Sequence, residues 1–75
     1  MPSKKQKPRR GLAVLSPREK QVVRLVADGI GTVPISRKLA ISDKTVRTHL
    51  QNVLRKLGLH SRLELAVLVL QGKLA

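Results

Sequence analysis

Apolar residues recur at helical spacing between positions 41 and 58 and predict the longest element of the chain. The members of this stripe are Val46, Leu50, Val53, Leu54 and Leu57. They fall on one face of a helix over residues 43–57, with Gly58 as its stop. The opposite face holds only hydrogen-bonding side chains and no acidic residue: Lys44, Arg47, Thr48, Gln51 and Arg55.

This two-faced pattern has two interpretations. A helix that packs by one face and presents arginine, lysine, glutamine and threonine on the other suits the major groove of duplex DNA. The alternative is an ordinary solvated amphipathic helix. Surface helices usually mix charge signs and this face does not, so the pattern favours the DNA-reading interpretation.

Two shorter helices are predicted before this one. The first begins at a capping box formed by Ser16 and Glu19, with proline at its first helical position, and ends at Gly29. Its inward residues are Val22, Val23, Leu25 and Val26. The second has Pro34 in its first turn, Ile35 and Leu39 inward, and Arg37 and Lys38 outward. The turn over residues 40–42 leads to Ser42 as the next cap, which completes a helix-turn-helix.

A fourth helix is predicted from a second capping box at residues 61–64 to a stop near Gly72. Leu65, Leu68 and Val69 can face the core. The opposite side would then expose four apolar residues: Leu63, Ala66, Val67 and Leu70. An exposed apolar stripe favours self-association; the alternative is a tight bundle that buries both faces.

The fold class predicted from these elements is all-α, a compact four-helix bundle containing a helix-turn-helix over residues 12–75. Residues 1–11 hold five basic residues and two prolines, which predicts a disordered basic tail or linker. The tail could be a solubilising leader, the stub of an inter-domain linker, or a flexible arm that adds phosphate contacts.

The chain carries 16 Lys and Arg against four Asp and Glu, a net charge of +12. Without the tail, 11 basic residues face the same four acids, an excess of +7. This excess indicates a polyanionic partner, with nucleic acid first and an acidic membrane surface second. Aromatic residues, on which single strands and RNA loops usually stack, are absent, which favours duplex DNA.

No apolar run approaches the roughly 20 residues of a membrane-spanning helix, so we expect a soluble cytoplasmic protein associated with the nucleoid. A membrane-surface role is disfavoured because the fourth helix has basic residues only at its ends.

The residues that could carry chemistry are few. Cysteine is absent and the two histidines have no cluster of acids around them, so we expect no metal, no cofactor and no enzymatic activity. His49 is predicted to be a packed core residue with a hydrogen bond, and His60 to reach a phosphate. Glu19 and Glu64 are explained by their capping boxes.

Several motifs resemble one family. Residues 15–19, 27–29, 41–46, 54–58 and 61–62, together with His49, are similar in order and spacing to the LuxR-type helix-turn-helix shared by LuxR, GerE and the NarL/FixJ response regulators, with the closing segment most like the NarL branch. The resemblance runs from about residue 12 to 71. Pro34 departs from a commonly acidic position, and Ala40 from a position often held by glycine. If position 40 needs a positive φ, alanine costs about 1 kcal/mol there.

The resemblance implies a four-helix DNA-binding domain whose third helix lies in the major groove and whose fourth helix pairs with a second copy. It assigns base contacts to Arg47, Thr48 and Gln51, and phosphate contacts to Lys44, Thr45, Asn52 and Arg55. Lys38 and His60 are added as outward basic residues that could reach phosphates.

The predicted function is a sequence-specific transcriptional regulator that binds double-stranded DNA as a homodimer, on half-sites about 34 Å apart or closer. The chain could also be the effector domain of a response regulator, in which case a receiver domain or partner regulator would control it. The alternative is a non-specific DNA-binding or protein-interaction module of the same fold.

Overall fold

The computed structural model describes residues 12–73; the predicted tail, residues 1–11, lies outside the described residues, as do residues 74–75. A short 3₁₀ helix, η1 (Leu12–Val14), precedes four α-helices, which are α1 (Pro17–Ala27), α2 (Thr32–Leu39), α3 (Asp43–Leu57) and α4 (Arg62–Leu70). The predicted all-α class and the four helices are confirmed. The 3₁₀ helix was not predicted, and it places Leu12 and Val14 against the core.

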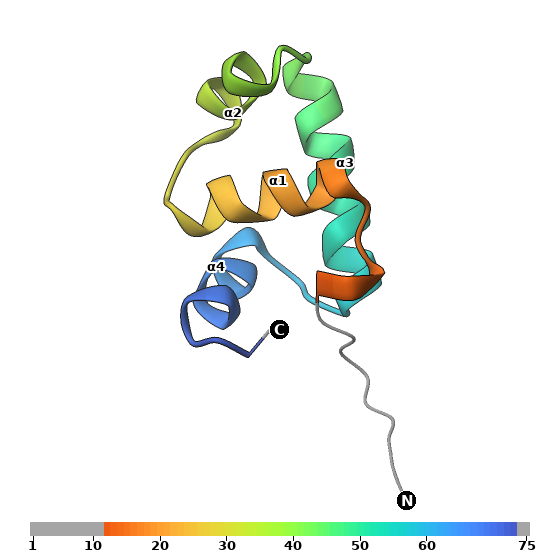
Figure 1. Ribbon diagram of the computed structural model, residues 1–75, viewed down its shortest axis with the longest axis vertical. Coiled ribbons are helices and arrows are strands. Elements are labelled where there is room, and N and C mark those ends of the chain that lie inside the picture. The colour runs from red at the N-terminus through yellow and green to blue at the C-terminus, as the bar shows by residue number, and fades with distance from the viewer. Residues whose placement is uncertain (1–11, 74–75) are drawn as a thin grey trace, which may run out of the picture.

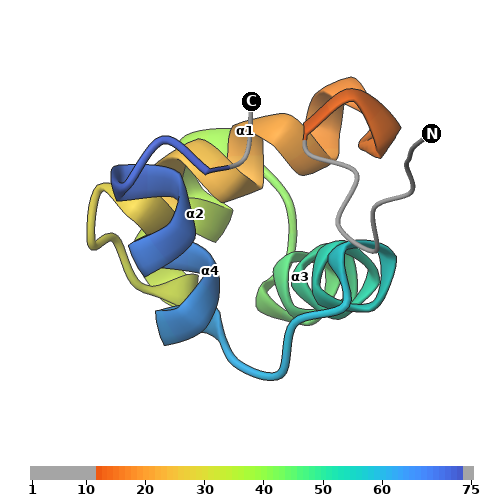
Figure 2. The ribbon, with the colours of Figure 1, turned by 90° about the horizontal axis from the view of Figure 1, so that it is seen from below.

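The helices are arranged around α1, which packs against α3 and α4, while α2 packs against α3. Figure 1 shows α3 upright beside one end of α1, with α2 above α1 and α4 below it. Figure 2 views α3 nearly end-on and shows that one side of it is covered by no other helix. The long helix is therefore held by one face and open on the other.

The core is purely aliphatic and draws on every α-helix. It consists of Leu15, Val22, Val23, Val26, Ile35, Val46, Leu50, Val53, Leu57, Leu59 and Leu65. Leu25 and Leu54, which were predicted on inward faces, are only half-buried and pack at the edge of this cluster. Burial of such side chains contributes roughly 1.5–3 kcal/mol each, which is the main stabilising term for so small a domain.

The start of α1 forms the predicted capping box. The Ser16 hydroxyl accepts a hydrogen bond from the Glu19 backbone N–H at 3.1 Å, and the Glu19 carboxylate accepts one from the Ser16 N–H at 2.9 Å. The start of α4 differs from its prediction. Ser61 caps the Glu64 N–H at 3.1 Å, but the Glu64 carboxylate takes the backbone N–H of His60 at 2.9 Å. The second capping box is therefore shifted by one residue, because the chain enters α4 from a bend that turns the His60 amide toward the first turn.

The turn of the helix-turn-helix depends on Ala40. Its backbone is left-handed, with φ 57° and ψ 44°, and the following Ile41 N–H closes on the Ser36 carbonyl at 3.0 Å. Gly58 ends α3 in the same way, with φ 71° and a 2.8 Å bond from the Leu59 N–H to the Leu54 carbonyl. Position 40 therefore does need a positive φ, and alanine there is strained as the sequence suggested.

Candidate nucleic-acid interface

The outward face of α3 is the polar stripe that the sequence predicted. Lys44, Arg47, Thr48, Gln51 and Arg55 are all exposed. On the other side of the same helix, Val46 and Val53 are completely buried, and Leu57 is 1% exposed. Because the apolar side fixes the rotation of the helix, the polar side is held outward over about three turns.

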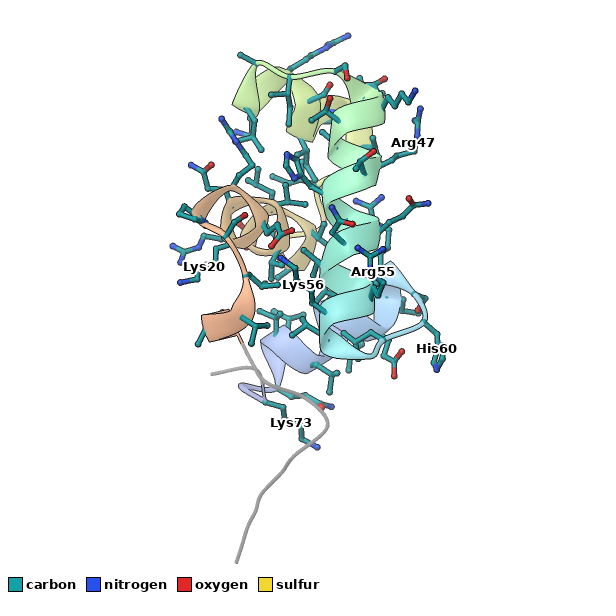
Figure 3. All side chains as sticks on the ribbon, turned by 90° about the vertical axis from the view of Figure 1, so that its right-hand side faces the viewer. Lys20, Arg47, Arg55, Lys56, His60 and Lys73 are labelled. Atoms are coloured by element: carbon teal, nitrogen blue, oxygen red, sulfur yellow. The ribbon has the colours of Figure 1, made fainter. Side chains whose placement is uncertain are left out.

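Figure 3 shows how the labelled side chains lie along this helix. Arg47 extends from its upper part, Arg55 from its lower part, and His60 from the loop just beyond its end. Each of the exposed positions 44, 47, 48, 51 and 55 lies three or four residues from another member of the set, so they form one continuous band rather than separate patches. The centre of this band is the trio predicted to contact bases, Arg47, Thr48 and Gln51.

The residues predicted to contact phosphates lie around this central trio, and the side chains of three of them have partners within the chain. Arg55 Nη2 donates to Asn52 Oδ1 at 2.7 Å, which holds the guanidinium beside the helix. The Thr45 hydroxyl lies 2.8 Å from that of Ser42, whose oxygen also accepts the Thr45 N–H at 3.0 Å. Asn52 and Thr45 are half-buried. Both therefore serve helix geometry as well as offering polar atoms at the edge of the band.

Lys38 and His60 lie at opposite ends of this surface. Lys38 is exposed in the last turn of α2, beside a hollow that it shares with α1. His60 is exposed in the loop before α4, and its backbone rather than its ring is engaged with Glu64. The structure thus places both residues away from the centre of the band, at its margins.

His49 does not occupy the core as the sequence predicted. It is half-buried, on the flank of α3 between the apolar and polar sides, and its ring makes no hydrogen bond within residues 12–73. The reason is positional, since Val46, Leu50 and Val53 already fill the inward direction of the helix.

An ion pair that the sequence analysis missed ties α3 to α1. Lys56 Nζ lies 2.8 Å from Glu19 Oε1, and Glu19 is almost completely buried. Burial raises the pKa of the Glu19 carboxyl, but the hydrogen bonds from Lys56 and Ser16 and the charge of Lys56 outweigh it, so the pKa is lowered from its ordinary value. Glu19 therefore acts both as the cap of α1 and as an anchor for α3. Sequence spacing carries no signal for a contact across 37 residues.

A second missed contact joins α4 to the start of the helix-turn-helix. The Arg62 guanidinium donates to the Thr32 hydroxyl at 3.1 Å and to the Ile30 carbonyl at 3.2 Å. The capping pattern had suggested only that Arg62 follows a helix cap. The structure shows that it also fixes the first turn of α4 against the α1–α2 loop.

The outward side of α4 is apolar, as predicted, with one exception. Leu63 is 71% exposed, Leu70 is 73% exposed and Val67 is 40% exposed. Ala66 was predicted to share this exposure, but it is half-buried against the core. It lies between the direction of Leu65 and Val69 and that of Leu63 and Leu70, so the body of the domain partly covers it.

Residues 12–73 contain no group of three or more metal-binding side chains. Over the same range, no helix has both the length and the hydropathy needed to span a bilayer.

Comparison with known proteins gives the family of this fold and surface. The family model for bacterial regulatory proteins of the luxR family matches residues 13–69, about three quarters of the chain. Its match includes all four α-helices except the last residue of α4.

Individual relatives agree with this match. A protein of Mycobacterium bovis, named as a transcriptional regulator of the helix-turn-helix type, is 46% identical over 61 residues, which are 81% of this chain and 7% of that protein. The nitrate/nitrite response regulator NarL of Escherichia coli is 40% identical over 60 residues, 80% of this chain and 28% of NarL. The oxygen regulatory protein NreC of Staphylococcus aureus is 43% identical over 61 residues, which are 81% of this chain and 28% of NreC.

The chain thus spans less than a third of each of these three relatives. The similarity lies in the helical domain and covers both the helix-turn-helix and α4. The family is not enzymatic, in agreement with the prediction from the sequence. The chain belongs to the luxR family of bacterial regulatory proteins and is a helix-turn-helix DNA-binding domain of a transcriptional regulator.

Proposed function

We propose that the domain recognises a specific sequence in duplex DNA by placing α3 in the major groove. The observation that carries this proposal is the exposed, acid-free band on α3, opposite a side of the helix on which Val46 and Val53 are completely buried. A B-DNA major groove is about 12 Å wide and admits one α-helix. The uncovered side of α3 in Figure 2 leaves room for that approach.

Within the band, Arg47, Thr48 and Gln51 contact base edges. Arginine can donate two parallel hydrogen bonds to guanine O6 and N7, and glutamine can pair with adenine N6 and N7. Arg47 is therefore the first candidate for a guanine reader. It is exposed, and no hydrogen bond to another side chain of residues 12–73 occupies its guanidinium.

The surrounding polar residues hold the DNA backbone and position α3 in the groove. These phosphate-contacting residues are Lys44, Thr45, Asn52, Arg55, Lys38 and His60. The 2.7 Å bond between Asn52 and Arg55 supports this role, because it orients the guanidinium before DNA binds and reduces the entropy lost on binding.

Two copies pair through α4 on the DNA. The proposed interface consists of Leu63, Ala66, Val67 and Leu70, of which three are substantially exposed in the single chain. A two-fold pair would place two copies of α3 on half-sites about 34 Å apart or closer. Such a regulator acts on bacterial DNA in the cytoplasm, either alone or as the effector part of a larger response regulator, as the names of NarL and NreC suggest.

The test is selection of bound duplexes from a random pool, followed by fluorescence anisotropy of the selected duplex and a scrambled duplex across a salt series. We expect a motif with repeated half-sites that binds at least about 1,000-fold more tightly than the scrambled duplex. Equal affinity for both duplexes, with a steep salt dependence, would make the domain a non-specific DNA-binding or interaction module.

A further inference from the structure

A basic hollow lies between α1 and α2, and of its lining residues only Lys38 has a part in the DNA contacts proposed above. Its volume is about 600 Å³. It is lined by Lys20, Gln21, Arg24, Leu25, Lys38 and Leu39. All its charged residues are cationic, and every polar member is exposed at the rim.

The two leucines of the hollow give it an apolar floor. Leu25 and Leu39 are half-buried and pack against the core cluster, one from each helix. Half-exposed leucines surrounded by cations are the complement of an acidic segment that also presents an apolar side chain. A DNA backbone offers the negative charge without the apolar group, so it would leave the floor of the hollow in contact with water.

Lys20, one of the residues that line the hollow, points away from the DNA-reading band. In Figure 3, Lys20 extends to the left, away from α3, while Arg47 extends to the right of α3 and Arg55 lies along that helix. A duplex centred on α3 therefore leaves Lys20 and its neighbours on α1 available to another molecule. Lys38, at the end of α2 just before the turn into α3, lies at the border of the two surfaces.

We propose that this hollow is a docking surface for a segment of a partner protein in which Asp or Glu stands beside apolar residues. This goes beyond DNA binding, because it gives the domain a protein contact that it can make while α3 and α4 are occupied. The carboxylates of the segment pair with Lys20 and Arg24, and an apolar side chain rests on Leu25 and Leu39.

The experiment is a titration of the ¹⁵N-labelled full chain with a synthetic peptide of about 12 residues that has glutamates and leucines at helical spacing. A second peptide has serine in place of each leucine. We expect saturable amide shifts at residues 20–25 and 38–39 with the first peptide, and at least tenfold weaker binding, about 1.4 kcal/mol, of the second. Shifts centred on α3, or equal affinity for the two peptides, would overturn the proposal.

Charge-reversal variants complete the test. Lys20→Glu and Arg24→Glu should each weaken peptide binding about tenfold or more, whereas Lys73→Glu, an exposed lysine outside the hollow, changes net charge equally and should have an effect below about twofold. Circular dichroism and thermal melting verify folding, which we expect to be unchanged because both substitutions are at exposed positions of α1. Equal losses in all three variants would reveal attraction by net charge alone and contradict the proposal.

The same variants distinguish a protein partner from DNA. On the selected duplex, Lys20→Glu and Arg24→Glu should behave like Lys73→Glu, with the small common loss that net charge causes. If they weaken duplex binding much more than Lys73→Glu does, the hollow is a phosphate-binding surface and the proposed protein contact is wrong.

Discussion

Helices α3 and α4 are both anchored by completely buried side chains, yet they present opposite chemistry to the outside. On α3, Val46 and Val53 are inaccessible and the outward side is cationic and polar. On α4, Leu65 is inaccessible, but Leu63 and Leu70 on the outward side are more exposed than buried. Burial therefore holds both helices, while the outward residues differ in chemistry, which is why we propose DNA as the partner of α3 and a second apolar surface as the partner of α4.

The strongest way to test the contrast within α4 is to truncate a leucine on each of its two sides. Leu65→Ala should lower the free energy of unfolding by about 2–5 kcal/mol, because it leaves a cavity in a fully packed core. Leu63→Ala should change it by less than about 0.5 kcal/mol. Urea denaturation followed by circular dichroism measures both, and similar losses for the two variants would mean that the two sides of α4 do not differ as described.

Substituting the exposed leucines tests the proposed pairing without disturbing the fold. In the double variant Leu63→Ser and Leu70→Ser, we expect binding to a duplex with two half-sites to weaken by about 2 kcal/mol, or roughly 30-fold, from lost apolar burial. Affinity for a single half-site should be unchanged. Anisotropy on both duplexes measures this, and an equal loss on each would show that these leucines act on DNA binding and not on pairing.

The ion pair between α1 and α3 should contribute a pH-dependent part of the stability. Glu19→Gln keeps an acceptor for the cap but removes the charge that holds Lys56. We expect the free energy of unfolding to fall by on the order of 1 kcal/mol near neutral pH. Solvent screening keeps this loss small, because Lys56 is 40% exposed. The pKa of Glu19 is lowered in the folded state. The contribution is therefore present above its ordinary value of about 4.3 and is lost as the pH falls through the folded value.

Unfolding measured in urea at several pH values checks this expectation. The difference between the parent and Glu19→Gln should shrink on acidification. Glu64→Gln is the matched control, because Glu64 has the equivalent position in α4 but no ion pair among residues 12–73. A difference that stays constant from neutral to acid pH would contradict the role given to the charge of Glu19.

The smallest effect is expected at the turn between α2 and α3. Ala40→Gly should stabilise the domain by about 0.5–1 kcal/mol, because glycine relieves the left-handed strain at φ 57° but makes the unfolded chain more flexible. Gly58→Ala should destabilise it by about 1 kcal/mol. The cost comes from the left-handed backbone, with φ 71°, and not from a clash, because an added Cβ meets no atom within 4 Å. Thermal melting measures both variants. Melting temperatures that shift in opposite directions support this interpretation, and a lower melting temperature for Ala40→Gly would be inconsistent with it.

The local features of this fold were predictable from sequence because they depend on nearby residues. Ser16 and Ser42 cap their helices through bonds spanning three residues, and the α3 boundaries, Asp43 and Leu57, agree with the prediction. The predicted polar band is exposed as a whole, because it is the geometric opposite of the apolar stripe.

The long-range contacts could not be predicted in this way. Lys56 and Glu19 are separated by 37 residues and Arg62 and Thr32 by 30, and helical periodicity carries no information about how two helices meet. The hollow between α1 and α2 is a consequence of the same packing. The burial of Ala66 was mispredicted for a related reason, since a residue between two faces is covered or exposed according to the neighbouring helix.

Base reading by Arg47 is the claim on which the contrast between α3 and α4 rests, and its direct test compares discrimination rather than affinity. Anisotropy is measured for the parent, Arg47→Ala and Lys44→Ala on the selected duplex and on duplexes with one base pair changed at a time. Arg47→Ala should lose about 1–3 kcal/mol on the selected duplex and become indifferent to one guanine position, while Lys44→Ala weakens every duplex equally and keeps the preference. An Arg47→Ala variant that retains full preference at every position would contradict base reading by the exposed face of α3.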